Sequence, residues 1–418
     1  MIKKLPEKAV CFKVTFSFLL NNWNTMMKQR IIIGFLCICL ASMAFAQERI
    51  RIEHGPYLQN LKETETTIVW MASKPSVGWA ELAPDDGSTY YQKEREKFFD
   101  TTNGVKNTSL LHVVKISGLK PGTGYRYRVY AQEVLDHQGV EVTYGKVAAT
   151  DVYGAKPLVF TTNDRHKPET SFAMINDIHG RTDDIPKLLE VADYKKMDMI
   201  IFNGDMLTQL KDESGLFSGF MDVAIDLFAK EKPMYYARGN HETRGLFATS
   251  FQRYFSPKEP HLYYLVRQGP VCFIFLDTGE DKPDSDIEYS GITDYDRYRT
   301  EQAQWLAQAV QSDDFKQAKY KIVIAHMPPL PDKNLWHGQM EVLEKFVPIL
   351  NQAGVDVMLS GHLHRYFNNK PTDKVKFPVI DNAHKTVIKA VAESNQLVLE
   401  VKDLQGKPVD TIVILPNK

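Results

Sequence analysis

The sequence has few cysteines, no excess of either charge and no apolar run long enough to span a membrane comfortably. It contains 418 residues and four cysteines, and Cys11, Cys37 and Cys39 all lie within the first 46 positions. Only Cys272 remains in the rest of the chain, which excludes an intrachain disulfide and a thiolate metal site there. Cys272 stands in the apolar run 271–276 and is predicted to be a buried core residue.

Net charge is also nearly absent. Lys and Arg number 51 against 52 Asp and Glu, which gives a formal net charge of -1. This balance provides no broad electrostatic footprint for nucleic acid. With 43% hydrophobic and 25% charged residues, the composition is that of a globular protein with a substantial core. The length predicts two to three domains.

Near the N-terminus, the stretch from Met27 to Ala46 has the pattern of a secretory signal peptide. A basic start precedes the apolar run Ile31–Leu40, and Ala44-Phe45-Ala46 forms a small-x-small cleavage site. The run is shorter than the roughly 20 residues that span a bilayer, although an uncleaved anchor is the alternative. Residues 1–26 are interpreted as a gene-model extension. We therefore expect residues 1–46 to be removed, with export to the periplasm or the extracellular space and no transmembrane segment in the mature chain.

Residues 47–165 are predicted to form an all-β sandwich. Short runs rich in Val, Ile, Thr and aromatic residues alternate with turn residues, as is typical of antiparallel sandwiches. The predicted strands are Thr66–Trp70, Val77–Leu82, Leu111–Ile116 and Tyr125–Tyr130. The turn Gly118-Leu-Lys-Pro-Gly-Thr-Gly-Tyr125 resembles fibronectin type III modules, and His54-Gly-Pro-Tyr-Leu58 followed by Thr67-Ile-Val-Trp70 resembles the N-terminal domain of purple acid phosphatases. No chemical cluster lies here, so the block is interpreted as a scaffold or docking module.

Residues 166–418 change to an α/β rhythm in which apolar strands alternate with segments of helical period. The predicted strands are Ser171–Ile175, Met199–Phe202, Pro233–Ala237, Val271–Leu276, Tyr320–Ala325 and Val355–Leu359. The predicted helices are Ile185–Tyr194, Phe217–Ala229, Thr300–Val310 and Met340–Ala353. Three tail strands, Thr386–Ala390, Leu397–Val401 and Asp410–Leu415, are expected to complete the second sheet.

Five polar motifs each follow one of these predicted strands directly. They are Asn176-Asp177-Ile178-His179-Gly180, Asn203-Gly204-Asp205, Arg238-Gly239-Asn240-His241-Glu242, the lone His326, and Ser360-Gly361-His362-Leu363-His364. In open α/β folds, ligands bind at the carboxyl ends of the strands. A single His at a strand end is more often a structural residue, but five ordered clusters favour a shared site.

The side chains in these motifs suit a pair of transition-metal ions. Carboxylate, carboxamide and imidazole ligands favour Fe, Mn or Zn over calcium. Asp205 is able to bridge two ions because a carboxylate has two oxygens with several lone pairs. Two ions roughly 3.5–4 Å apart hold a phosphate and lower the pKa of a bound water. The sequence therefore predicts two divalent or trivalent metal ions as cofactors.

The ordered motifs Asp-x-His, Gly-Asp, Gly-Asn-His-Glu, His and Gly-His-x-His resemble the calcineurin-like metallophosphoesterases. The resemblance covers residues 171–366 and implies a four-layer α/β/β/α sandwich with a dinuclear centre. It places Asp177, His179, Asp205 and His364 on the first metal, and Asp205, Asn240, His326 and His362 on the second. It assigns His241 to the leaving group or the phosphate. The alternative for His241 is a hydrogen bond within its own turn.

The chain departs from purple acid phosphatases at two positions. In that subgroup, the Gly-Asp motif continues to a Tyr that binds ferric iron and gives the colour. Here Gly204-Asp205 is followed by Met206-Leu207-Thr208, and the first motif keeps His179, which the subgroup lacks. The resemblance therefore implies a colourless metal site on a chain whose first domain is similar to the purple enzymes.

Weaker features surround these motifs. Arg238 and Arg365 flank the proposed ligands and are candidates for substrate phosphate contacts, with surface ion pairs as the alternative. The segment Asp277–Arg299 lacks a clear period and is predicted to be a long loop, while Trp336 and His337 are candidates for the mouth of the site.

These observations lead to a hypothesis of an exported metallophosphoesterase that hydrolyses phosphate mono- or diesters by a metal-activated hydroxide, without a covalent phosphoenzyme. A small-molecule phosphate ester is the expected partner, and no oligomeric state is predicted. One alternative is a non-catalytic binding protein on a phosphatase scaffold, although all seven ligands are present. Another is an enzyme specific for nucleotides, cyclic nucleotides or phospholipid head groups, because the motifs encode the metals and the loops encode the leaving group.

Overall fold

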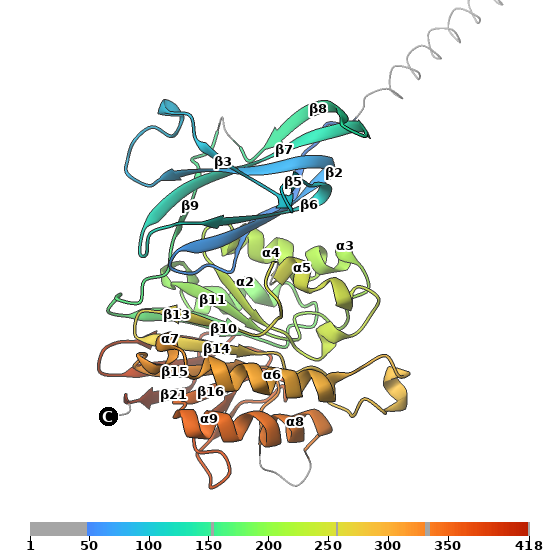
Figure 1. Ribbon diagram of the computed structural model, residues 1–418. Helices are drawn as coiled ribbons and strands as arrows, with labels where there is room; N and C mark the ends of the chain where they lie inside the picture. Colours follow the sequence, from blue (N-terminus) through green and yellow to red (C-terminus); the bar gives the residue numbers. More distant parts are fainter. Residues whose placement is uncertain (1–47, 152–153, 256–257, 331–334, 417–418) are drawn as a thin grey trace, which may run out of the picture. The chain divides into compact units, whose positions relative to one another are not determined.

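The computed structural model describes residues 48–151, 154–255, 258–330 and 335–416. The predicted signal peptide lies outside these residues. Ile50–Lys418 form one compact unit, so the expected division between residues 165 and 166 stays a prediction. Figure 1 shows the all-β part of this unit followed by layers of helices and sheets.

The first part of the chain forms the predicted β-sandwich. Its strands are β1 (Ile52–Gln59), β2 (Glu65–Pro84), β3 (Glu96–Phe99), β6 (Thr108–Ser117), β7 (Gly124–Gln138), β8 (Glu141–Ala149) and β9 (Leu158–Thr161), with the small hairpin β4 (Thr101–Thr102) and β5 (Val105–Lys106). A core that includes Trp70, Tyr127 and Phe160 is fully buried inside it.

Strand β2 corrects one expectation, since it joins two predicted strands into a single 20-residue strand. Its first half pairs with β1 and β6, and its second half pairs with β3 and β7. The register shifts between Met71 and Ser76, around Lys74-Pro75, which the sequence suggests as a break. Proline is tolerated at such irregular positions, so β2 continues through the irregularity and joins all of its partners in one seven-stranded sheet.

Two six-stranded sheets build the second part of the unit. The first has the order β12-β11-β10-β19-β20-β21, with bounds β10 (Thr170–Ile175), β11 (Met199–Asn203), β12 (Met234–Ala237), β19 (Thr386–Ala392), β20 (Leu397–Asp403) and β21 (Pro408–Ile414). The second has the order β13-β14-β15-β16-β18-β17, with bounds β13 (Tyr264–Gln268), β14 (Val271–Leu276), β15 (Tyr320–Ala325), β16 (Val357–Ser360), β17 (Phe367–Asn369) and β18 (Val379–Asp381). An apolar core containing Phe172, Phe273 and Leu399 joins the two sheets.

Helices cover the outer face of each sheet. On the first sheet lie α2 (Asp184–Val191), α3 (Glu213–Leu216), α4 (Asp222–Ala224) and α5 (Gln252–Phe255), and on the second lie α6 (Tyr295–Ala309), α7 (Asp313–Lys316), α8 (His337–Glu341) and α9 (Val347–Ala353). Each helical layer shares a buried apolar cluster with its sheet, including Leu188 on one side and Leu306 on the other. This arrangement confirms the predicted four layers (Figure 1).

Two further expectations are corrected. The tail strands β19, β20 and β21 extend the first sheet, because β19 pairs antiparallel with the free edge of β10. The second sheet is completed instead by β17 and β18, which are too short to give a periodic signal. The expected loop 277–299 is also shorter, because Asp284 accepts hydrogen bonds from the backbone N–H groups of Tyr295 and Asp296 and so starts α6 at Tyr295.

Buried contacts attach the sandwich to the first helical layer. Tyr57 and Val69 belong to the same apolar cluster as Phe217 and Tyr254. The hydroxyl of Tyr127 donates to the carbonyl of Lys230 at 2.6 Å. The two parts therefore share a core, which explains why they form one unit. In the described residues, none of the helices combines the length and the apolar character needed to cross a membrane.

Candidate metal centre

The five motifs converge at one place because their strands are parallel within each sheet. Strands β10, β11 and β12 lie side by side in the first sheet, and β14, β15 and β16 lie side by side in the second. Parallel neighbouring strands deliver the residues that follow them to the same edge of a sheet. The two sheets face each other, so residues from both meet at this edge (Figure 1).

The first group of candidate ligands contains Asp177, His179, Asp205 and His364, with one ligand atom from each lying within 4.8 Å of the others. Nε2 of His364 lies 3.3 Å from Oδ1 of Asp177. Nε2 of His179 lies 3.1 Å from Nε2 of His364. Nitrogen and oxygen atoms with lone pairs therefore point at a common centre.

The second group contains Asp205, His326 and His362. Nε2 of His326 lies 3.2 Å from Oδ2 of Asp205. Asn240 belongs to the same group, because its Oδ1 lies 3.1 Å from Nδ1 of His362. The structure thus brings all seven candidate ligands together, in the two sets that the resemblance implies.

Asp205 is the residue shared by the two groups. Its Oδ1 accepts a hydrogen bond from the backbone N–H of His241 at 2.9 Å. Its Oδ2 faces both groups, at 3.2 Å from Nε2 of His326 and 3.8 Å from Nε2 of His179. Asp205 is therefore the carboxylate that would serve both ligand groups if each held an ion.

Backbone conformation at the site is unusual. Five of the seven candidate ligands have a positive φ: Asp177 (53°), His179 (50°), Asp205 (53°), His362 (76°) and His364 (58°). Residues other than glycine rarely adopt this conformation, which costs about 1–3 kcal/mol each and clusters at functional sites. The strands end in strained turns that aim these side chains at the centre.

Two glycines allow the close approach of these turns. A Cβ on Gly239 would lie 2.2 Å from Oδ1 of Asp205, and a Cβ on Gly361 would lie 2.8 Å from Oδ2 of Asp177. Neither distance is compatible with a side chain. The glycines of the third and fifth motifs therefore stand where the backbone has no room for a Cβ.

Buried polar residues around the ligands hold the turns in place. The carboxylate of Glu242 accepts hydrogen bonds from the backbone N–H groups of Asp205 (2.8 Å), Leu207 (3.0 Å) and Gly239 (3.0 Å). Oδ2 of Asp177 accepts from Nδ2 of Asn176 (2.6 Å) and from the backbone N–H of His362 (2.9 Å). These contacts leave Oδ1 of Asp177 free of hydrogen bonds and turned toward the centre.

The electrostatics of the protein alone favour a cation at this place. Burial lowers the pKa of His179 and of His362 to about 4, so both imidazoles are neutral near pH 7. Burial opposes a charge on His326, but the Asp205 carboxylate raises its pKa to about 10. Burial also opposes the charge of Asp205, yet the neighbouring His326 holds the pKa of this carboxyl well below its usual range. Without a metal, a proton on His326 offsets part of the negative charge of the two buried carboxylates, and a metal cation can take its place.

Two buried atoms of the candidate ligands have the surroundings expected of metal-binding atoms. Oδ1 of Asp177 and Nε2 of His326 are buried and have no hydrogen-bond partner. Such orphaned atoms are rare in folded proteins, and an ion is one of their standard explanations. Nδ1 of His326 donates to the carbonyl of Asn203 at 2.7 Å, which leaves the Nε2 lone pair directed at the centre. Imidazole, carboxylate and amide oxygen are ligands for Fe, Mn or Zn.

His241 lies beside the two groups. Nδ1 of His241 contacts the carbonyl of Thr208 at 2.7 Å and must donate to it, because a carbonyl only accepts. This bond directs Nε2 toward the ligands, at 3.9 Å from Oδ2 of Asp205. The imidazole is partly exposed and its ring packs edge-on against that of His179. His241 therefore has one ring nitrogen available at the open side of the centre.

The two arginines that the sequence suggests for phosphate contacts differ in position. Arg238 is almost fully buried, and its Nη2 lies 2.8 Å from Oδ2 of Asp277. Tyr298 donates to the same carboxylate oxygen, so Arg238 is held within a network behind the ligands. Arg365 is exposed and follows His364 directly.

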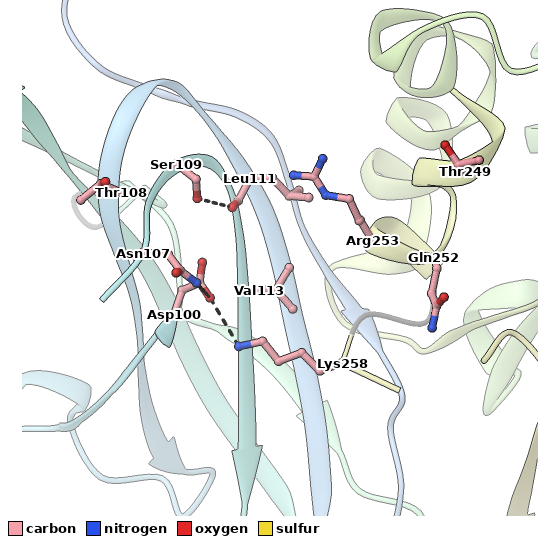
Figure 2. Close-up of a pocket in the computed structure, with 10 residues that line it drawn as sticks. All are labelled: Asp100, Asn107, Thr108, Ser109, Leu111, Val113, Thr249, Gln252, Arg253 and Lys258. Carbon is pink, nitrogen blue, oxygen red and sulfur yellow. Dashed lines mark hydrogen bonds and ion pairs between the residues drawn. The ribbon is translucent and has the colours of Figure 1, made fainter. Parts of the chain in front are cut away.

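A cavity of about 570 Å³ lies away from these residues, between β6 and the segment around α5 (Figure 2). Its described lining consists of Asp100, Asn107, Thr108, Ser109, Leu111, Val113, Thr249, Gln252, Arg253 and Lys258. The seven candidate ligands are not part of this lining. Lys258 points into it and pairs with Asp100 (Figure 2), so this cavity is part of the contact between the sandwich and the helical layer.

Sequence reasoning missed several residues that shape the centre. The backbone carbonyl of Asn382 accepts a hydrogen bond from Nδ2 of Asn176, and Nδ2 of Asn382 donates to Oδ1 of Asn176. Asn382 therefore fixes the residue next to Asp177. Asp381, just before it, is fully buried at the end of β18. A short apolar run, Val379-Ile380, followed by Asp and Asn repeats the pattern of the five motifs and is the signal that could have identified this sixth strand end.

Comparison with known proteins agrees with this geometry. Residues 170–366 match the model of the calcineurin-like phosphoesterase family. The chain is 24% identical to purple acid phosphatase 18 of Arabidopsis thaliana over 294 residues, which are 65% of this chain and 61% of that protein. It is 21% identical over 375 residues to probable purple acid phosphatase 20 of the same plant, covering 82% of this chain and 78% of that protein.

A further relative, purple acid phosphatase 21 of Arabidopsis thaliana, is 24% identical over 302 residues. The chain spans about three fifths of the length of two relatives, 61% of purple acid phosphatase 18 and 60% of purple acid phosphatase 21. Among solved structures, the purple acid phosphatase PPD1 from yellow lupin (Lupinus luteus) has a TM-score of 0.62 at 14% identity, covering 86% of this chain and 74% of that one. Residues 170–366 are therefore a calcineurin-like phosphoesterase domain, and the chain has the overall fold of a purple acid phosphatase.

Proposed function

We propose that this protein is a metal-dependent hydrolase of phosphate mono- or diesters. The observation that carries the proposal is the convergence of seven side chains into two ligand groups that share Asp205. The buried orphan atoms of Asp177 and His326 support it, because a bound cation would satisfy both a carboxylate oxygen and an imidazole nitrogen.

The residues take the following roles in the proposal. Asp177, His179, Asp205 and His364 hold one ion, and Asp205, Asn240, His326 and His362 hold the other. Bound ions lower the pKa of a water molecule and offset the negative charge of the phosphate. His241 directs Nε2 to the open side, where it donates a proton to the leaving oxygen or a hydrogen bond to the phosphate. Glu242 and Asn176 keep the ligand-bearing turns in position.

Phosphate release tests this function directly. The protein should release phosphate or alcohol from generic aryl phosphate mono- or diesters, lose this activity after treatment with a chelator, and regain it with Mn²⁺, Zn²⁺ or iron. The reason is that the ligand groups hold negative charge that the fold alone leaves unbalanced. Metal content is measured on the same sample. A chelated, metal-free protein with undiminished activity would refute the proposal, and a metal-free protein as purified would favour the binding-protein alternative.

A second prediction concerns colour. We expect the iron-loaded protein to lack a ferric-tyrosinate absorption band, because His179 rather than a tyrosine lies with Asp177, Asp205 and His364. Thr208 stands three residues after Asp205, and its carbonyl is engaged by His241. A visible spectrum of the iron-loaded protein checks this. A strong band like that of the purple enzymes would mean that a tyrosine hydroxyl reaches the metal.

Export and domain organisation complete the proposal. The pattern of residues 27–46 supports export to the periplasm or extracellular space, and mass spectrometry of the secreted protein would show whether cleavage follows Ala46. We place the boundary between the sandwich and the phosphoesterase domain at residues 165 and 166, in the connection between β9 and β10. Arg365, exposed beside His364, remains the better placed of the two arginines for contact with substrate phosphate.

A further inference from the structure

Three loops beside the candidate metal centre carry large apolar side chains that face solvent. Leu246 is 96% exposed, Ile287 is 93% exposed and Ile292 is 88% exposed, while Trp336 and Met340 are 49% and 40% exposed. We call these five residues the apolar rim. Isolated exposed apolar residues are ordinary, but a concentration of them around a site indicates a binding surface.

The rim belongs to the loops that follow ligand-bearing or neighbouring strands. Leu246 lies five residues after His241 in the loop after β12. Ile287 and Ile292 lie in the loop between β14 and α6, which extends beyond the body of the domain in Figure 1. Trp336 and Met340 lie at the start of α8, after His326. These loops leave the same edge of the sheets as the candidate ligands.

Buried contacts connect the three loops and hold the rim in place. The carboxylate of Glu280 accepts hydrogen bonds from Thr243 (2.7 Å), from Arg244 (2.7 and 2.8 Å) and from Tyr289 (2.9 Å). The backbone N–H of Gly338 donates to the carbonyl of Asp281 at 2.8 Å. Oγ1 of Thr243 also lies 2.7 Å from the carbonyl oxygen of Asn240, so this network reaches a candidate ligand.

Leu246 shows that the exposure is enforced by the backbone. The preceding Gly245 has a φ of +104° and packs so closely that a Cβ there would lie 2.1 Å from the carbonyl oxygen of Leu210. The following Phe247 donates its N–H to the same carbonyl at 3.1 Å. The turn is therefore fixed on both sides of Leu246, whose side chain cannot fold back into the core.

Two basic side chains near the rim residues pair with acidic neighbours. Arg244 pairs with Glu280, and Lys282 pairs with Glu288 while its Nζ lies 5.8 Å from the ring of Trp336. Asp281 is near enough to His362 to act on it electrostatically. These two basic groups are therefore engaged, while the five apolar side chains of the rim stay exposed. Four of its five residues are aliphatic or thioether side chains, which favour a flexible hydrocarbon over a polar nucleobase.

We propose that the substrate is an amphiphilic phosphate ester, in which the metal centre holds the phosphate and the apolar rim contacts a hydrocarbon group of the alcohol. This inference rests on the proposed function and specifies its substrate class. Contact with the rim removes hydrocarbon from water, and each fully buried CH₂ contributes about 0.8 kcal/mol. The rim is open on one side, so the gain per CH₂ is a fraction of this amount.

The test is a series of 1-alkyl phosphates with two to eight carbons, each kept below its critical micelle concentration, with alkyl 4-nitrophenyl diesters of the same chain lengths run in parallel. We expect kcat/KM to rise on the order of tenfold from the two-carbon to the eight-carbon ester. Two variants remove parts of the rim: the double variant Ile287→Ser with Ile292→Ser, and Trp336→Ser. In each, the ratio of kcat/KM for the eight-carbon ester to kcat/KM for the two-carbon ester should fall below about two. The control is Val140→Ser, since Val140 is 98% exposed in the turn between β7 and β8, away from the rim, and this variant should keep the full ratio.

The outcomes separate this inference from the function on which it rests. Hydrolysis of the short ester without any gain for longer chains would overturn the apolar contact alone. An unchanged ratio in the rim variants would also overturn it. If no ester is hydrolysed, the two-carbon compounds included, the proposed function is overturned and this inference with it.

Discussion

The Asp205→Asn variant should lose at least about 100-fold in activity and should bind less metal than the unmodified protein. Residues that only support metal ligands cost 10–100-fold when they are replaced, so a ligand shared by two ions is expected to cost more. The replacement keeps an oxygen that can accept from the N–H of His241, which limits damage to the turn. It removes the negative charge that faces both ligand groups. Phosphate release and metal content per chain measure the two effects.

Asp226→Asn is the matched control for this variant. Asp226 is 78% exposed and pairs with Lys230 one helical turn away, as exposed surface ion pairs do. The control should keep both activity and metal content. If Asp205→Asn also keeps them, with an unchanged circular dichroism spectrum, the shared carboxylate is not a ligand and the two-ion arrangement is wrong.

The convergence of the candidate ligands could be predicted from the sequence because the relevant information is local. Each of the five motifs directly follows an apolar strand, and parallel neighbouring strands are required to deliver their ends to one edge. The order of layers could be predicted for a similar reason, since apolar runs and segments of helical period alternate along the chain. Neither step needs knowledge of how distant side chains pack.

Features that depend on distant packing could not be predicted. The assignment of β19 to the first sheet depends on which strand edge is free, and alternating apolar residues look the same beside either sheet. Glu242 is visible in the sequence, but its three backbone hydrogen bonds join turns that follow two different strands. The positive φ of Asp177 and Asp205 is equally hidden, because strain is imposed by the surrounding fold.

Gly204 lies at the point where the turns approach most closely, and Gly204→Ala should be among the most damaging single substitutions in the chain. Its φ is +80°, and an added Cβ would lie 2.5 Å from Nδ1 of His326 and 2.6 Å from Cα of Gly239. The left-handed backbone costs an alanine about 1–2 kcal/mol. Overpacking adds about 1–3 kcal/mol and displaces His326 from the hydrogen bond that orients it. The midpoint of thermal unfolding and the rate of phosphate release should both fall.

Gly180→Ala separates the two causes. Gly180 has a φ of +75°, almost that of Gly204, but an added Cβ there would meet nothing within 4 Å. This variant should therefore show the backbone cost alone, and the midpoint of its unfolding should lie between those of the unmodified protein and Gly204→Ala. Equal midpoints for the two variants would mean that the turn after β11 relaxes to admit a methyl group. In that case the close contact between Gly204 and His326 would not be what fixes the position of this ligand.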